Sequence, residues 1–439
     1  MRARALFLVG LICAAMPTQS QEFTTLKGHG GPIMDISVNA ETGQVATASF
    51  DNSVGLWEGR EPLWLEGHEA AVNTVTQFRP DVLISGGDDF ALWLWDEDGG
   101  TRLGAHLGKI ADVAAGPDGE TIATASWDGS IGVWIVIRSG DPAQWNTLTK
   151  KLEGHEAGVN AVTFSANGSR IYSASSDGTI RVWSDGGKRS RVLVSNGFGI
   201  NKLVVNEAAG WLAYGAVDGV TRVIDPESGD TIADFTLERR PILSMAYHAE
   251  TDQLAVGDGQ GYIMMIDTAE WRIARDFRAM RQGPVWALDF GLDGKAIYAG
   301  GIEDVVFSWP VAFLDEYDPA GGDTRSFLRE ADAMPNGERQ FMRKCSICHA
   351  LTPPPSRKAG PTLHGVFGRR AGTVPGYRYS DVLSGSDIIW SDDTIDQLFD
   401  LGPDHYIPGS KMPMQVIAKA EDRRDLVEFL RQAAGNGEN

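Results

Sequence analysis

The stretch Leu152-Glu153-Gly154-His155 opens a pattern that recurs along the first two thirds of the chain. An alternating apolar run, Val159–Phe164, follows it, and then come a polar turn at 165–168 and a second apolar run at 171–175. A third run ends at Trp183. Alternation of apolar and polar side chains is typical of half-buried β-strands. The unit therefore predicts short antiparallel strands that are joined by tight turns.

Copies of this unit begin at Leu26-Lys27-Gly28-His29 and Leu65-Glu66-Gly67-His68, and a degenerate copy begins at Gly104-Ala105-His106. Four of the third runs end in a tryptophan that follows an aspartate by six residues. These pairs are Asp51 and Trp57, Asp89 and Trp95, Asp128 and Trp134, and Asp177 and Trp183. A period of about 40 residues indicates a β-propeller with four strands in each blade.

The later repeats have lost most of these residues. Ile224-Asp225 and Ile266-Asp267 stand where the tryptophans stood, and Trp309 ends the last repeat. Counting the strand ends predicts seven blades over residues 21–314. Residues 23–26 precede the first Gly-His pair, so we expect them to supply the outer strand of the last blade. An open ring would leave unpaired strand edges exposed.

The repeats resemble the WD40 family over roughly two thirds of the chain. Residues such as His155, Ser175 and Asp177 include the types that form a nucleophile, a base and an orienting acid. The same types recur in blade after blade, however, and a catalytic triad has no reason to repeat around a ring. WD40 proteins use such residues as a buried hydrogen-bonded group, so we interpret them as structural. His248 lies outside the pattern and is expected at a surface or a turn.

The pentapeptide Cys345-Ser346-Ile347-Cys348-His349 is the attachment signature of c-type haem. Two thiols three positions apart on one helical turn can reach the two vinyl groups on one edge of a porphyrin. The following imidazole then lies under the iron. Zinc sites and dithiol redox sites share the Cys-x-x-Cys spacing, and the adjoining His349 is what favours haem.

Beyond an acidic linker at 315–331, residues 332–435 resemble class I cytochrome c, an all-α family. The motifs stand in the order that the family has them: Cys345-Ser346-Ile347-Cys348-His349; Gly360-Pro361-Thr362-Leu363-His364-Gly365-Val366-Phe367-Gly368-Arg369; Gly376-Tyr377-Arg378-Tyr379-Ser380; Trp390; and Tyr406-Ile407-Pro408-Gly409-Ser410-Lys411-Met412. A helix is expected to begin at Pro335-Asn336-Gly337 and to run into Cys345. Gly337 and Phe341 are expected to meet the last helix.

The resemblance implies one haem c, bound covalently through Cys345 and Cys348. It implies His349 as the proximal ligand, with its other ring nitrogen held by the carbonyl of Pro361. Met412 would be the distal ligand, and His/Met ligation raises the reduction potential. With both axial positions filled, the iron favours electron transfer over catalysis. The residues expected on the haem-propionate side are Arg369, Tyr379 and Trp390.

Three other residues could supply the sixth ligand: Met414, His364 and His405. We favour Met412 because of its Pro-Gly-Ser-Lys-Met context. Two departures from the family pattern place apolar residues near the haem. Leu383 stands where the family often has an asparagine, and Leu398 or Phe399 stands where it often has a tyrosine. We hypothesise a drier pocket and a raised reduction potential.

The chain of 439 residues carries a net charge of -20, which argues against binding to nucleic acid. Residues 332–439 hold 13 basic and 14 acidic residues, so the rest of the chain carries -19. The basic residues expected around the haem are Arg343, Lys344, Arg357, Lys358 and Lys411. They predict docking on an acidic redox partner. The alternatives are a solvated surface without a specific partner and docking on the acidic propeller of the same chain.

Residues 1–20 have the features of a secretory signal. Arg2 and Arg4 form a basic start, and an apolar segment at 5–16 is too short to span a bilayer. Cleavage is expected near Ser20. The alternatives are an uncleaved anchor and lipidation of Cys13. Bacterial c-type haem is attached after translocation, so both signals predict a periplasmic protein.

The sequence thus predicts an exported electron carrier whose propeller is a docking platform for redox proteins or for a membrane respiratory complex. Two alternatives remain. The propeller could oxidise a small substrate and pass the electrons to the tethered haem, or the chain could be a non-redox assembly protein. No cofactor-binding constellation is apparent in the propeller sequence, so a carrier is preferred over an enzyme.

Overall fold

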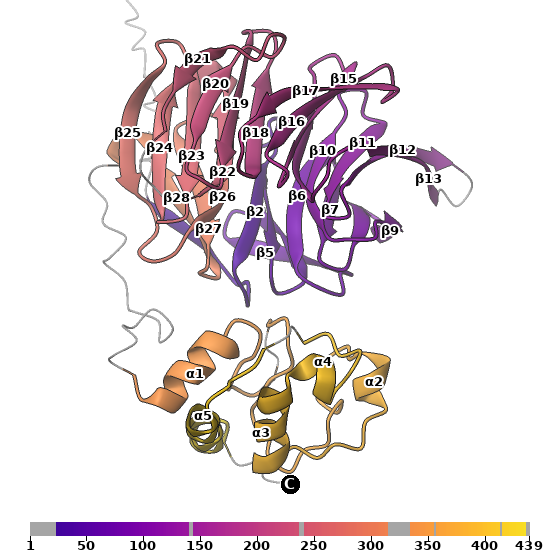
Figure 1. Ribbon diagram of the computed structural model, residues 1–439, viewed down its shortest axis with the longest axis vertical. Helices are drawn as coiled ribbons and strands as arrows, with labels where there is room; N and C mark the ends of the chain where they lie inside the picture. The colour runs from indigo at the N-terminus through magenta and orange to yellow at the C-terminus, as the bar shows by residue number, and fades with distance from the viewer. Residues whose placement is uncertain are drawn as a thin grey trace, which may run out of the picture.

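The computed structural model describes residues 23–139, 144–236, 241–314, 334–354, 357–412 and 415–435. In these ranges the chain forms a β-propeller, residues 23–314, and a helical domain, residues 334–435 (Figure 1). The predicted signal at 1–20, with Cys13, and the predicted linker at 315–331 lie outside the described residues.

Seven four-stranded antiparallel sheets make up the described part of the propeller, as the repeats predicted. Blade 1 has β2 (Ile33–Val38), β3 (Val45–Ser49), β4 (Ser53–Glu58) and β5 (Glu61–Glu66). Blade 2 has β6 (Val72–Arg79), β7 (Val82–Gly87), β8 (Ala91–Asp96) and β9 (Gly99–Ala105). Blade 3 has β10 (Ile110–Ala115), β11 (Thr121–Ser126), β12 (Ser130–Ser139) and β13 (Gln144–Glu153). Blade 4 has β14 (Val159–Phe164), β15 (Arg170–Ser175), β16 (Thr179–Ser184) and β17 (Arg189–Ser195).

The remaining three blades follow the same plan. Blade 5 has β18 (Ile200–Asn206), β19 (Trp211–Ala216), β20 (Thr221–Ile224) and β21 (Thr231–Asp234). Blade 6 has β22 (Ile242–His248), β23 (Gln253–Asp258), β24 (Tyr262–Asp267) and β25 (Arg272–Arg278). Blade 7 has β26 (Val285–Phe290), β27 (Ala296–Gly301), β28 (Val305–Pro310) and β1 (Thr24–Lys27). Short 3-10 helices lie at Ala249–Thr251 and Val311–Phe313.

The strand β1 closes the ring. It pairs antiparallel with β28, so that Thr24 lies opposite Ser308 and Lys27 opposite Val305. The expectation that residues 23–26 complete the last blade is confirmed, although the strand itself begins at Thr24 and ends at Lys27. Pairing of the two ends removes the exposed edge that an open ring would have.

The first strands of the blades contact one another around the centre of the ring. Each carries an irregularity after its first residue, as between Ile33 and Asp35 in β2. A β-bulge of this kind bends the strand and redirects the side chain that follows. In blade 1 the Oδ2 atom of Asp35 accepts a hydrogen bond of 3.0 Å from the backbone N–H of Val75 in blade 2. Bulged aspartates thereby tie neighbouring blades together.

The helical domain contains α1 (Asn336–Lys344), α2 (Asp381–Ser384), α3 (Asp392–Leu401), α4 (Pro403–Tyr406) and α5 (Ala420–Ala433). Glu338 in the first turn of α1 and Arg343 and Lys344 in its last turn complement the helix dipole. Ser391 caps α3 in a capping box with Thr394.

Helices α1 and α5 cross closely, as the sequence predicted. A Cβ atom on Gly337 would lie 2.1 Å from the carbonyl oxygen of Asp425, so only glycine allows this approach. The rings of Phe341 and Phe429 pack beside it, with their centroids 5.5 Å apart. Arg423 of α5 also pairs with Asp396 of α3 at 2.9 Å. These contacts build the framework around a central cavity.

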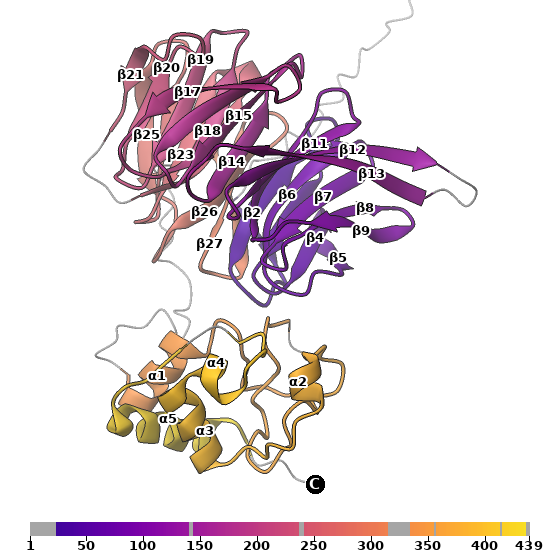
Figure 2. The ribbon, with the colours of Figure 1, turned by 45° about the vertical axis from the view of Figure 1, so that its right-hand side comes forward.

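The helical domain lies beneath blades 1 and 2 in Figure 1, on the side where β5 is found. Figure 2 shows the same arrangement after a rotation, and it shows the long β12–β13 hairpin reaching away from the ring. Among the described residues, none of the helices has both the length and the apolar character that a membrane crossing requires.

Candidate functional site

Each repeated histidine of the propeller forms hydrogen bonds through both ring nitrogens to side chains of a single blade. In blade 4 the Nδ1 atom of His155 lies 2.8 Å from the Oδ2 atom of Asp177, and its Nε2 atom lies 2.8 Å from the Oγ atom of Ser173. The indole N–H of Trp183 donates to the same Ser173 hydroxyl at 2.8 Å. The corresponding groups of blades 1 to 3 are centred on His29, His68 and His106.

This geometry supports the structural interpretation, but it changes one member of the group. The hydroxyl that meets His155 belongs to Ser173, while Ser175 accepts a bond from the backbone N–H of Asp177 and donates to the carbonyl of Gly158. The triad of His155, Ser175 and Asp177 named from the sequence is therefore not assembled. Ser173 could have been found from its recurrence as serine or threonine two residues earlier in each repeat.

Burial sets the charge of these groups. It lowers the pKa of His155 and of His106, although the neighbouring aspartates oppose this shift. Burial tends to raise the pKa of Asp177, but hydrogen bonds from Thr179, the backbone of Glu156 and His155 lower it to about 2. A neutral imidazole beside an ionised carboxylate is the resulting state near pH 7. His248, at the end of β22, bonds to Thr251 and Leu292 near the surface, as expected.

A second group of titratable residues lines the centre of the ring. Asp112 and Asp289 accept backbone hydrogen bonds from neighbouring blades in the way that Asp35 does. Burial raises the pKa of Asp35 to about 6 and that of Asp289 to about 7. Among the described residues, no cluster of histidine, cysteine and acidic side chains has the arrangement to hold a metal ion. These carboxylates hold the blades together.

A cavity of about 340 Å³ opens in the helical domain. It is lined by every site residue predicted from the sequence: Cys345, Cys348, His349, Pro361, Arg369, Tyr379, Trp390 and Met412. Segments from α1 to the loop after α4 thus converge on one space, although they are spread over almost 70 positions of the sequence. The volume is in the range of cofactor sites.

The position of His349 is fixed by two neighbours. Its Nδ1 atom donates a hydrogen bond to the carbonyl oxygen of Pro361 at 2.7 Å, since a carbonyl can only accept. The Nε2 atom is then the unprotonated nitrogen, because burial lowers the pKa of the imidazole and keeps it neutral. A Cβ atom on Gly360 would lie 2.5 Å from the ring, so glycine leaves the space that the ring needs.

The two thiols lie at the start of the cavity, directly after α1. Cys345 is buried and Cys348 is partly buried. Burial raises the pKa of Cys345 to about 12 and also raises that of Cys348, so both are held as thiols rather than as thiolates. A backbone bond from the His349 N–H to the Cys345 carbonyl, 2.8 Å long, keeps the pentapeptide on one turn.

Polar groups in the wall show that the cavity fits an anionic, largely apolar cofactor. Arg369 is half buried and donates to the carbonyls of His364 and Thr362, both at 2.7 Å. No carboxylate among the described residues pairs with it, so a haem propionate would supply its counter-ion. Buried atoms of the wall without a hydrogen-bond partner in the described part of the chain are Ser380 Oγ, Ser410 Oγ and Gln415 Oε1.

The rival axial residues lie elsewhere or outside the described residues. His405 is exposed on α4, and His364 packs near Gly435 rather than along the cavity. Met414 lies outside the described residues. Leu383, Leu398 and Phe399 all line the cavity, so both departures from the family pattern place apolar side chains in its wall.

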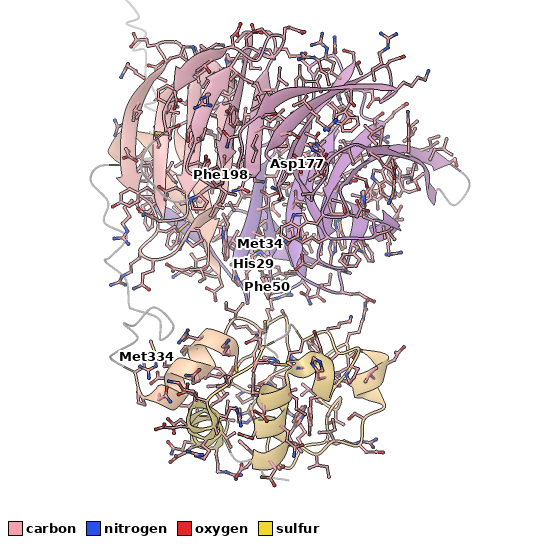
Figure 3. All side chains as sticks on the ribbon, in the orientation of Figure 1. His29, Met34, Phe50, Asp177, Phe198 and Met334 are labelled. Carbon is pink, nitrogen blue, oxygen red and sulfur yellow. The ribbon has the colours of Figure 1, made fainter. Side chains whose placement is uncertain are left out.

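Part of the cavity wall comes from the propeller, which the site residues predicted from the sequence did not include. The propeller residues concerned are Phe50, Asn52, Glu69, Ala70, Ala71 and Asp88. Figure 3 shows Phe50 and His29 on the side of the propeller that faces the helical domain, and Phe198 and Asp177 farther from that domain. Long-range surface contacts of this kind leave no periodic signal in a sequence.

Comparison with known proteins agrees with this division. The model of the WD domain, G-beta repeat, matches residues 20–58, 61–96, 100–134 and 146–184, which are the first four repeats. The model of the cytochrome c family matches residues 335–434. The WD40 β-propeller domain of Doa1 superimposes with a TM-score of 0.57 at 18% identity and covers 65% of this chain and 94% of that one. That likeness shows the fold alone.

Relatives of the helical domain are much closer in sequence. Cytochrome c of Arabidopsis thaliana is 42% identical over 96 residues, which make up 22% of this chain and 85% of the relative. Cytochrome c of Gibberella zeae is 37% identical over 114 residues, 26% of this chain and 97% of the relative. These relatives imply one covalently attached haem c, with Cys345 and Cys348 as the attachment candidates. The chain belongs to the cytochrome c family through its helical domain, which it carries behind a seven-bladed propeller of WD40 repeats.

Proposed function

We propose that this protein is an exported one-electron carrier in which His349 and Met412 bind the haem iron. The observation that carries the proposal is the orientation of His349. Its Nδ1 atom is committed to Pro361, so Nε2 remains as the ligand atom in a cavity that Met412 also lines. A bound haem supplies one-electron chemistry between Fe(II) and Fe(III). The soft thioether of Met412 would favour the reduced state, and an iron bound by both His349 and Met412 would have no open site for a substrate.

Replacement of Met412 tests the axial assignment. In Met412→Leu holoprotein we expect loss of the sulfur-to-iron charge-transfer absorbance and a fall in reduction potential on the order of 0.1 V, since axial ligands set haem potentials over about 0.8 V. Met334→Leu is the control, because Met334 is a buried methionine of the same domain that does not line the cavity. Absence of this band from the wild type, or an unchanged spectrum in Met412→Leu, would overturn the assignment; a changed haem spectrum in His405→Ala would then identify His405 as the ligand.

Export to the periplasm is supported by the basic and apolar pattern of residues 1–20 and by the chemistry of haem attachment after translocation. The expected mature protein begins near residue 21. Mass spectrometry of the purified N-terminus, with cell fractionation, checks this. A lipid on Cys13 or an intact residue 1 in protein from the membrane fraction would replace cleavage near Ser20 by one of the two anchoring alternatives.

The propeller is proposed as the docking platform for a redox protein or a membrane respiratory complex. Its net charge, together with that of the linker, favours a partner with a basic surface. The test uses oxidised holoprotein and a periplasmic extract that has been separated by size. Haem reduction by the macromolecular fraction supports a carrier, whereas reduction by one small metabolite supports the dehydrogenase alternative.

A further inference from the structure

We propose that β5 and the loops that precede β2 and β6 form a docking surface for the protein's own helical domain, and that this contact restricts access of redox partners to the haem cavity. The inference rests on the proposed electron-carrier function. The docking surface consists of Gly30, Trp64, Glu66 and Glu69, and its counterpart on the helical domain consists of Arg357, Arg378 and Lys411.

Charged groups meet across this surface. The guanidinium of Arg357 donates to Glu66 at 2.9 Å and lies 4.1 Å above the centre of the Trp64 ring. Lys411 pairs with Glu69 at 3.3 Å, and Arg378 approaches the same carboxylate at 4.0 Å. Exposed ion pairs are individually weak. Three cations on two carboxylates, with one cation stacked on tryptophan, nevertheless fix a single orientation.

Gly30 gives the strongest indication that blade 1 is adapted to this contact. A Cβ atom on Gly30 would lie 1.1 Å from the carbonyl oxygen of Arg357, so the backbone of the helical domain occupies the place of a side chain. The backbone φ of Gly30 is not in the left-handed region, so the local turn does not require glycine. The approach of Arg357 does.

Comparison with the other repeats makes this point independently. The residue after the histidine donates its N–H to the group's aspartate in blades 1 to 4, and those residues are Gly30, Glu69, Leu107 and Glu156. The positions are therefore equivalent, and only blade 1 has glycine there. The position of Trp64 also differs between repeats. Arg102 and Lys151 stand at the equivalent positions, the same number of residues before the next histidine.

Docking places the propeller over the cavity. Phe50, Asn52 and Asp88 line it together with Cys348 and Tyr379, and Lys411 adjoins the proposed ligand Met412. An acidic redox partner that approaches the cavity from this side must compete with Glu66 and Glu69 for the same basic side chains. The propeller is thus an internal competitor for partners of the helical domain.

The experiment measures oxidation of reduced holoprotein by two small oxidants of opposite charge, the hexacyanoferrate(III) anion and the hexaammineruthenium(III) cation. One variant is the double substitution Glu66→Gln and Glu69→Gln. Its matched control is Glu153→Gln and Glu156→Gln, since Glu153-Gly154-His155-Glu156 repeats Glu66-Gly67-His68-Glu69 in blade 4. Among the described residues, neither control carboxylate has an ion pair with the helical domain.

A second variant, Gly30→Leu, changes no charge and installs the residue that blade 3 already carries as Leu107. We expect both oxidants to react several-fold faster in both interface variants, with a larger radius of gyration in X-ray scattering, and no such change in the control. Faster reaction with the anion and slower reaction with the cation would indicate a local charge effect only. That result, or unchanged rates and scattering in Gly30→Leu, overturns the proposal. The Met412→Leu spectrum tests the carrier function separately, because it does not depend on docking.

Discussion

Buried polar groups of the propeller and of the helical domain are satisfied in different ways. In blades 1 to 4 each central histidine finds both of its hydrogen-bond partners within its own blade. In blade 4 these partners of His155 are Asp177 and Ser173. In the helical domain, Arg369 has no carboxylate partner among the described residues, and Ser380, Ser410 and Gln415 present unpaired atoms in the cavity wall. The histidine-centred groups are complete as polypeptide, whereas the cavity wall of the helical domain surrounds a group that the polypeptide does not supply. Stability should therefore respond to different changes in the two domains.

The largest effect is expected when the cofactor cannot be attached. Cys345→Ala with Cys348→Ala leaves a cavity of about 340 Å³ unfilled. At about 24 cal/mol per Å³ this costs roughly 8 kcal/mol, which is comparable with the whole stability of a small domain. Calorimetry should show loss of the helical-domain transition and retention of the propeller transition. Ile347→Ala, at a partly exposed position between the two cysteines, leaves both thiols in place and is the control. A cooperative helical-domain transition in the double variant would contradict the comparison.

A substitution in a histidine-centred group should lower the stability of the propeller alone. His155→Ala leaves the buried Asp177 carboxylate and the Ser173 hydroxyl without their shared partner, at a cost of about 3 kcal/mol. The propeller transition should fall in temperature while the haem absorbance stays unchanged. His248→Ala, which removes a histidine near the surface, should change the transition much less. Equal effects of the two substitutions would show that the groups are not the source of stability.

The buried carboxyl group of Asp289 gives the stability of the propeller a pH dependence that one substitution should remove. Burial raises the pKa of Asp289 from 3.8 to about 7, so the folded state retains a proton that the unfolded state has lost. This stabilising contribution is complete below pH 3.8 and is lost as the pH rises through about 7. Asp289→Asn keeps an acceptor for the Val38 N–H but loses the one for the Phe290 N–H. The net rise in the unfolding free energy at pH 8 should be on the order of 2 kcal/mol.

Measurement of denaturant unfolding at pH 8 and at pH 4 checks this prediction. The advantage of Asp289→Asn should nearly disappear at pH 4, where the carboxyl is protonated in the folded wild type. Asp81→Asn, at the exposed turn between β6 and β7, is the control for removal of one negative charge. An advantage of the same size at both pH values would refute the role of burial.

The smallest expected effect concerns the apolar wall of the cavity. Leu383→Asn introduces a dipole where the family often has one, and this should favour Fe(III) by about 1 kcal/mol, equivalent to a fall of about 40 mV for one electron. A potentiometric titration of wild type and variant measures it. Val382→Asn, at an exposed neighbouring position, is the control. A raised potential in Leu383→Asn would contradict the drier-pocket hypothesis.

Local patterns in the sequence predicted much of this architecture. The repeats predicted seven blades, and the unassigned residues 23–26 predicted ring closure, because strand periodicity and the need to pair edges are both visible in a sequence. The motifs around Cys345, Arg369, Tyr379 and Met412 predicted residues that the fold brings to one cavity. They did so through family resemblance, since nothing in the spacing alone unites segments so far apart.

The remaining features depend on three-dimensional contacts. Ser173 and Ser175 stand two residues apart on β15 and so point to the same face of the sheet. Only the position of His155, whose Nε2 atom lies 2.8 Å from the Ser173 hydroxyl, distinguishes them. The role of Gly30 could not be predicted, since a glycine after a histidine is unremarkable until Arg357 is placed beside it. Glu66 and Glu153 both stand in the sequence Leu-Glu-Gly-His-Glu-Ala, yet only Glu66 meets the helical domain among the described contacts.

Ring closure through β1 also determines the order in which the protein can assemble. Thr24–Lys27 leaves the ribosome early but must wait for Val305–Pro310 before it has a partner. Until then the nascent propeller has two free strand edges, the period in which it is most prone to pair with the wrong chain. The haem-binding residues are synthesised later still. The docking surface on blades 1 and 2 is therefore synthesised before the helical domain. The propeller is the first neighbour that each new helical domain encounters.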